Sequence, residues 1–141
     1  MDIYIRGALY VIATQIAYGI VKYIVEVFVG FDLNAGVGMV CFIVPAMLLG
    51  VHYFNTRGES ASSVKKLKIT AFLMLVQFVC AALTYLVAVQ FIPQIATIFI
   101  LLDLGIILGL FGFIFVLGFG ASYWAFGFGN KQGRKKSKGL T

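Results

Sequence analysis

Long apolar stretches dominate the chain and are separated by short segments of polar or turn-forming residues. A helix needs roughly 20 apolar residues to cross the hydrocarbon core of a bilayer. The longest internal polar segment, 55–68, leaves on either side enough apolar sequence for two crossings. We therefore predict four transmembrane helices, arranged as two antiparallel hairpins. Their expected ranges are about 3–29, 37–54, 65–92 and 95–125.

The basic residues are distributed unevenly between the predicted sides of the membrane. Lysine and arginine accumulate on the cytoplasmic side of membrane proteins. Of the 11 basic residues, Arg6, the four in 55–68 and the five in 131–138 fall on one side, and Lys22 is the exception. This asymmetry predicts that both termini are cytoplasmic.

The composition agrees with this class. Hydrophobic residues make up 62% and charged residues 11% of the 141 residues, with mean hydropathy +1.03. Soluble domains carry about a quarter charged residues. We predict an all-α integral membrane protein with a transmembrane domain at 1–130 and a polybasic cytoplasmic tail at 131–141. The net charge of +6 is interpreted as orienting charge, and no nucleic-acid partner is expected.

The C-terminal cations are predicted to contact anionic lipid headgroups from a disordered tail. Two Gly-Phe-Gly triplets, at 118–120 and 127–129, are expected to loosen the preceding helix. The predicted headgroup contacts are Lys131, Arg134, Lys135, Lys136 and Lys138.

Proline and glycine mark two further positions inside the predicted helices. Pro45 removes the backbone hydrogen bond to the Cys41 carbonyl, so a kink is expected there, serving either packing or a hinge. Gly105 and Gly109 form a Gly-x-x-x-Gly element, which suits close helix packing either within one chain or between two chains.

Three charged residues lie within the predicted spans: Lys22, Glu26 and Asp103. Lys22 and Glu26 are four residues apart and share a helix face. They either reach the nearby interface by snorkelling or take part in function. Asp103 has apolar neighbours and needs a partner from another helix or a proton, so a pair with Lys22 at matching depth is predicted.

Other chemistry is sparse. The two cysteines fall in apolar spans and are interpreted as small buried hydrophobic residues, and the one histidine sits at a predicted interface. No metal site or cofactor is expected. The sequence contains no pairing of a nucleophile with a general base, so an enzyme is not expected.

The stretch from Val44 to Val76 combines a proline inside the second helix, a polar turn after Arg57 and Gly58, and an immediate third helix. It resembles a family of small uncharacterised four-helix inner-membrane proteins of Gram-negative bacteria. The resemblance implies this architecture and a multi-pass location in the bacterial inner membrane.

Two classes of function fit these features. The first is a non-enzymatic protein that acts by protein–protein interaction in the membrane, as an immunity protein against a membrane-acting toxin or as an accessory subunit. The second is a small dimeric proton- or ion-coupled transporter or channel that uses Lys22, Glu26 and Asp103.

Overall fold

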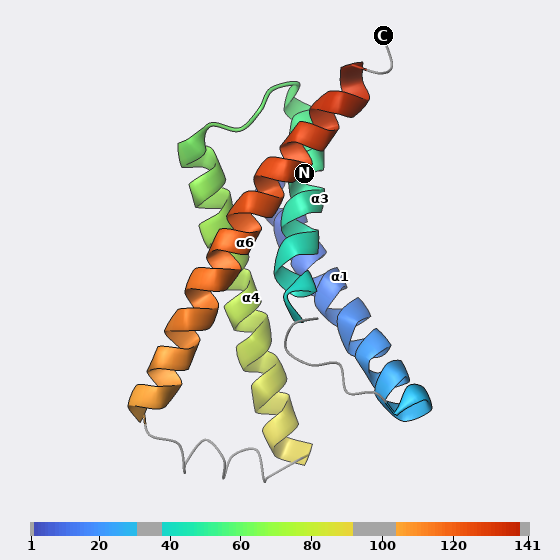
Figure 1. The fold of residues 1–141 in the computed structure, drawn as a ribbon, viewed down its shortest axis with the longest axis vertical. Coiled ribbons are helices and arrows are strands. Elements are labelled where there is room, and N and C mark those ends of the chain that lie inside the picture. The colour runs from blue at the N-terminus through green and yellow to red at the C-terminus, as the bar shows by residue number, and fades with distance from the viewer. Residues whose placement is uncertain (1, 31–37, 92–103, 139–141) are drawn as a thin grey trace.

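The computed structural model describes residues 2–30, 38–91 and 104–138, and every regular element in these residues is helical. Helix α1 (Ile3–Ile24) continues into a π-helical turn, η1 (Val25–Val29), and is followed by α3 (Val40–Arg57), α4 (Ser63–Phe91) and α6 (Leu104–Lys138). In Figure 1, α6 crosses α3 in the upper half of the view, with α4 and α1 on opposite sides of α3. The prediction of an all-α protein is confirmed.

Three stretches of these helices are long and apolar enough to cross a membrane: Ile3–Val29, Ser63–Val87 and Leu108–Lys135. Helix α3 has 18 residues and carries His52, Asn55 and Arg57 in its last two turns. These lengths support a membrane protein.

The turn between α3 and α4 follows from its local sequence. α3 stops at Gly58, whose φ of +69° is a left-handed conformation that glycine adopts without a steric penalty. The Gly58 N–H donates to the Phe54 carbonyl at 2.8 Å. Ser62 Oγ then accepts from the Lys65 N–H at 3.4 Å, the N-cap role expected of a serine here. The predicted helices at 37–54 and 65–92 match α3 and α4 within a few residues.

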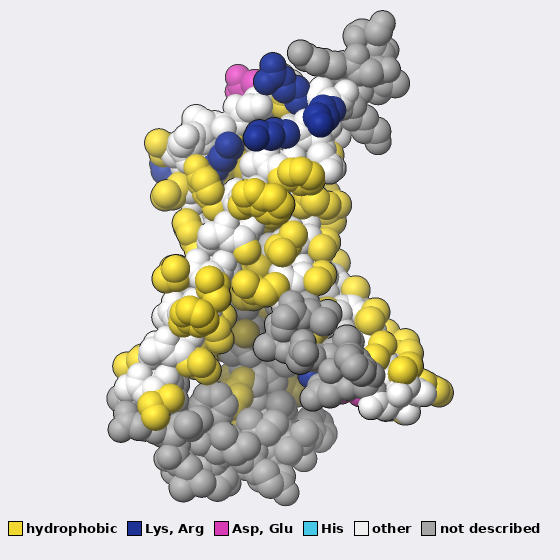
Figure 2. Space-filling view, viewed as in Figure 1, with side chains coloured by type: hydrophobic (Ala, Val, Ile, Leu, Met, Phe, Trp, Pro, Cys, Tyr) yellow, Lys and Arg dark blue, Asp and Glu magenta, His cyan; other side chains and the backbone are white. Residues whose placement is uncertain are grey.

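The buried core lies where α3 packs between α6, α4 and α1. Leu49 and Tyr53 of α3 are almost fully buried, and the Tyr53 ring meets Phe126 of α6 edge-on at 6.1 Å between centroids. The other buried core residues are Val11, Ala46, Ala61, Ile69, Leu73 and Ala125. The tightest packing therefore lies toward the end of the bundle that carries the basic residues, which Figure 2 shows in dark blue.

α6 continues to Lys138, well beyond the predicted helix end near residue 125, and the Gly-Phe-Gly triplets do not interrupt it. Its 35 residues correspond to about 52 Å of helix, more than the roughly 30 Å hydrocarbon core. Tertiary packing explains the continuation. A Cβ at Gly129 would fall on the carbonyl oxygen of Met47, and one at Gly133 would lie 3.0 Å from Phe54 Cβ. The segment predicted to be a disordered tail is therefore helical through Lys138, and Gly133 in it is buried against α3.

Candidate functional site

The polar centre of the bundle is the turn of α3 that Pro45 interrupts. Pro45 is buried and has no N–H, so the Cys41 carbonyl loses its helical donor. Gln77 Nε2 of α4 donates to this carbonyl at 2.7 Å. The next carbonyl, of Phe42, accepts from Ser122 Oγ of α6 at 3.1 Å. Two neighbouring helices thus supply donors to the interrupted turn, as a low-dielectric environment requires.

A cavity of about 320 Å³ adjoins this turn, within the size range of ligand pockets. All four long helices contribute to it, together with Gly38, which lies two residues before α3. Its lining consists of Gln15, Tyr18, Gly38, Cys41, Phe42, Gln77, Phe78, Ala81, Phe111 and Ile114. The aromatic walls are ordered by contact, since Phe78 lies 6.5 Å from Phe111 and stacks on Phe115 at 5.7 Å.

The chemistry of this cavity is apolar with a few neutral polar groups. Its lining includes no aspartate, glutamate, lysine, arginine or histidine among the described residues. The Gln77 Nε2 donates to the Cys41 carbonyl, and the other polar side chains of the lining are the Gln15 amide and the Tyr18 hydroxyl. Within the described ranges, no group of three metal-ligating side chains occurs. The cavity suits an apolar side chain or chain segment better than an ion.

A second hollow, of about 440 Å³, lies between α1 and α3. It is lined from α1 by residues such as Tyr10, Thr14 and Tyr18, and from α3 by Val40, Val44 and Leu48. Tyr18 lines both spaces. The middle of α1 is therefore flanked by open volume on two sides, whereas Val11, two turns earlier, is fully buried.

Comparison of the chain with protein-family models, with curated proteins and with solved structures finds no match.

Lys22 and Glu26 form an ion pair of 3.3 Å on α1 and η1, with side chains about two-fifths exposed, at 41% and 37%. Lys22 lies one helical turn beyond Tyr18 and so continues the face of α1 that lines the cavity. Asp103, its predicted partner, lies outside the described residues, and that pair stays a prediction.

The predicted glycine pair occupies an exposed part of α6. Gly105 and Gly109 are both exposed, and a Cβ at Gly109 would meet no described atom within 4 Å. The close approaches of α6 to its neighbours occur further along, where a Cβ at Gly118 would lie 2.8 Å from the Phe42 ring. The second interpretation of the pair, contact between two chains, remains a prediction.

The predicted headgroup residues Lys131, Arg134 and Lys135 are exposed near the end of α6. Figure 2 shows dark blue side chains gathered at that end of the molecule. The side chains of Lys136 and Lys138 lie outside the described ones.

Sequence reasoning missed Gln77, Ser122 and the role of His52. Arg6 Nη1 lies 3.4 Å from His52 Nδ1 and must be the donor, because a guanidinium has no acceptor. The His52 Nε2–H then donates to Thr56 Oγ1 at 3.2 Å. The histidine therefore links α1 to α3. For Gln77, the signal was present: a freed carbonyl at Cys41 requires a donor, and an amide within an apolar run is a natural source.

Proposed function

We propose that the protein is a non-enzymatic, multi-pass protein of a bacterial inner membrane that acts through protein–protein interaction within the bilayer. The proposed interaction takes one of two forms: the protein is either an immunity protein against a membrane-acting toxin or an accessory subunit of a larger complex. The supporting observation is the cavity beside Pro45: aromatic, lined without charged side chains in the described chain, and of a size to receive apolar side chains from a partner helix.

The architecture proposed for this role has four membrane spans in two antiparallel hairpins, with both termini in the cytoplasm. The basic residues at one end of the bundle support this orientation. Reporter fusions at Asn34 and Gln94 are expected to read periplasmic, and fusions at Ser62 and Thr141 cytoplasmic. A cytoplasmic signal at Asn34 would remove α3 from the set of spanning helices.

A photo-crosslinking amino acid placed at Phe111 tests the proposed interaction. Phe111 lines the cavity, whereas Phe113 on the same helix is 63% exposed and does not line it. We expect a discrete crosslinked protein from position 111 in native cells and none from position 113. Filling the cavity with Ala81→Phe should abolish the crosslink. Identical crosslinking at both positions would contradict a partner that enters the cavity.

The second candidate function is a small dimeric proton- or ion-coupled transporter. The Lys22–Glu26 pair favours it, because the pair lies within the apolar stretch Ile3–Val29 and Lys22 continues the face of α1 that lines the cavity. Flux of protons and of a cationic dye into reconstituted vesicles separates the two functions. The interaction function predicts no flux above that of empty vesicles. A flux that the unsubstituted protein supports and Glu26→Gln abolishes would instead favour the transporter.

A further inference from the structure

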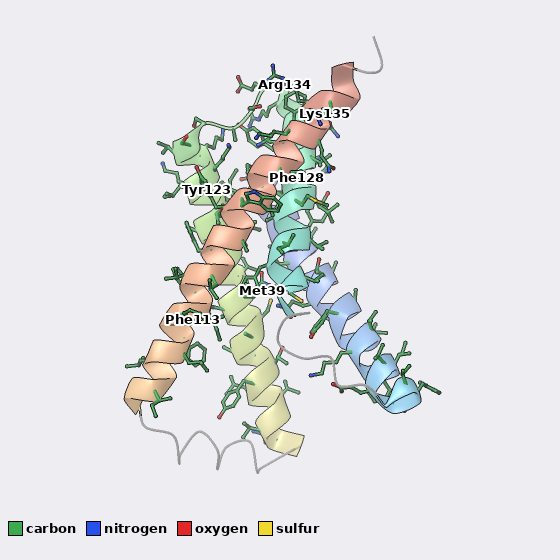
Figure 3. The ribbon with its side chains drawn as sticks, in the orientation of Figure 1. Met39, Phe113, Tyr123, Phe128, Arg134 and Lys135 are labelled. Atoms are coloured by element: carbon green, nitrogen blue, oxygen red, sulfur yellow. The ribbon has the colours of Figure 1, made fainter. Side chains whose placement is uncertain are left out.

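The outer face of α6 carries an ordered series of side chains near its C-terminal end. Trp124, Phe128, Lys131 and Lys135 follow one another at spacings of four, three and four residues, which places them on one helix face. The Trp124 and Phe128 rings stack, with centroids 5.4 Å apart and planes at 13°. Figure 3 places Phe128 on α6 below Arg134 and Lys135.

A groove of about 570 Å³ lies on this face, lined by Phe128, Lys131, Gln132 and Lys135. Its three polar side chains can all donate hydrogen bonds, and two of them are cations. No acidic side chain lines it among the described residues. The groove therefore has the charge of an anion site, and the Phe128 ring is part of its lining.

These side chains follow one another along the helix in the order in which a membrane changes from hydrocarbon to charged phosphate. Trp124 lies about 10 Å along the axis from Lys131, and Lys135 lies about 6 Å further. Tryptophan prefers the headgroup boundary, while lysine reaches the phosphates. The interfacial layer on each side of the hydrocarbon core is roughly 5–8 Å thick, so this part of α6 extends from the hydrocarbon boundary through the headgroup layer.

Packing on the opposite face of α6 keeps this series facing outward. Gly129 and Gly133 lie against Met47 and Phe54 of α3, and Phe126 is fully buried. At 100° per residue these positions lie on the side of the helix opposite Phe128 and Lys131. Trp124 is accordingly 64% exposed and both lysines are exposed.

We propose that this face of α6 binds the headgroup of an anionic phospholipid of the adjoining leaflet. The lipid phosphate lies between the Lys131 and Lys135 ammonium groups, with the Gln132 amide as a further donor. The glycerol and the first acyl carbons lie against the Trp124 and Phe128 rings. The site does not depend on the protein–protein function proposed above, because it requires membrane insertion and nothing else.

Trp124 is the only tryptophan of the chain, so its fluorescence reports on this site alone. The full chain would be reconstituted in phosphatidylcholine vesicles containing a minor fraction of brominated phosphatidylglycerol, or the same fraction of brominated phosphatidylcholine. Bromine quenches tryptophan at contact. Two cations near the membrane surface predict a preference for phosphatidylglycerol of up to about 30-fold. Lys131→Gln/Lys135→Gln is expected to reduce the preference nearly to none.

The matched control is Arg57→Gln/Lys68→Gln, which removes the same charge from two other exposed cations, at the end of α3 and near the start of α4. This variant should keep the preference for phosphatidylglycerol. Equal loss in both double variants would mean diffuse attraction and would overturn the site. Equal quenching by the two brominated lipids in the unsubstituted protein would also overturn it, and would leave this face to an acidic protein partner.

Discussion

Gly129→Ala is expected to destabilise the bundle by about 3 kcal/mol, the upper part of the usual range for overpacking a close contact. The added Cβ would fall on the carbonyl oxygen of Met47 and lie 3.1 Å from the Val51 nitrogen. These are backbone atoms of α3, so no side-chain rotation relieves the clash and the two helices must separate. Thermal unfolding in detergent, or unfolding in mixed micelles, would measure the loss.

Gly120→Ala is the matched control on the same helix. Gly120 is exposed, and a Cβ there would meet no described atom within 4 Å. Alanine is favoured over glycine inside a helix by up to about 1 kcal/mol, so this substitution should be neutral or stabilising. Equal destabilisation by the two substitutions would show that the backbone contact between α3 and α6 at Gly129 is not the cause of the lost stability.

Gly50→Ala tests the same crossing from the other helix. Its Cβ would fall on the Phe126 carbonyl and lie 3.1 Å from the Asn130 nitrogen. Because both glycines belong to one contact, their effects should not add, and Gly50→Ala/Gly129→Ala should cost less than the sum of the single variants.

Gln77→Met is expected to destabilise the protein by about 2 kcal/mol, because it leaves the buried Cys41 carbonyl without a donor. The side chain keeps a similar length, and Gln77 is 5% exposed, so water does not readily replace the amide. The value lies near the upper end of measured hydrogen bonds between membrane helices, since Pro45 has already removed the alternative donor.

The double variant Pro45→Ala/Gln77→Met isolates this effect. Alanine at position 45 restores a backbone N–H that can reach the Cys41 carbonyl. In the Pro45→Ala background, Gln77→Met should therefore cost less than about 0.5 kcal/mol. Gln15→Met makes the same chemical change on the cavity wall and should also alter the free energy of unfolding by less than about 0.5 kcal/mol. If Gln77→Met costs as much free energy of unfolding in the Pro45→Ala background as in the unsubstituted protein, the Gln77 amide does not replace the hydrogen bond that Pro45 removes from the Cys41 carbonyl.

Together these contacts divide the molecule into two parts with different packing. Near the basic end, α3 and α6 meet backbone to backbone at Gly50 and Gly129. On the N-terminal side of Pro45, the cavity lies between other parts of α3 and α6. A closely packed half beside an open apolar half would suit the proposed partner helix, because the receiving surface would be formed before the partner binds.

The sequence by itself determined the helical class, the approximate positions of α3 and α4, and the loss of a hydrogen bond at Cys41. These properties follow from local causes: the length of an apolar run, glycine and serine at helix ends, and the missing N–H of proline. They need no knowledge of which helices are neighbours.

The tertiary structure alone decided which glycines pack, that Gln77 and Ser122 donate to α3, and that α6 continues to Lys138. In a membrane helix, residues facing lipid and residues facing the bundle are both apolar, so periodicity does not reveal the buried face. The motif at Gly105 and Gly109 stood out in the sequence, yet Gly129 makes the backbone contact, because that depends on where two helices cross. The glycines near the end of α6 weaken a helix in isolation, and packing against α3 outweighs that weakness.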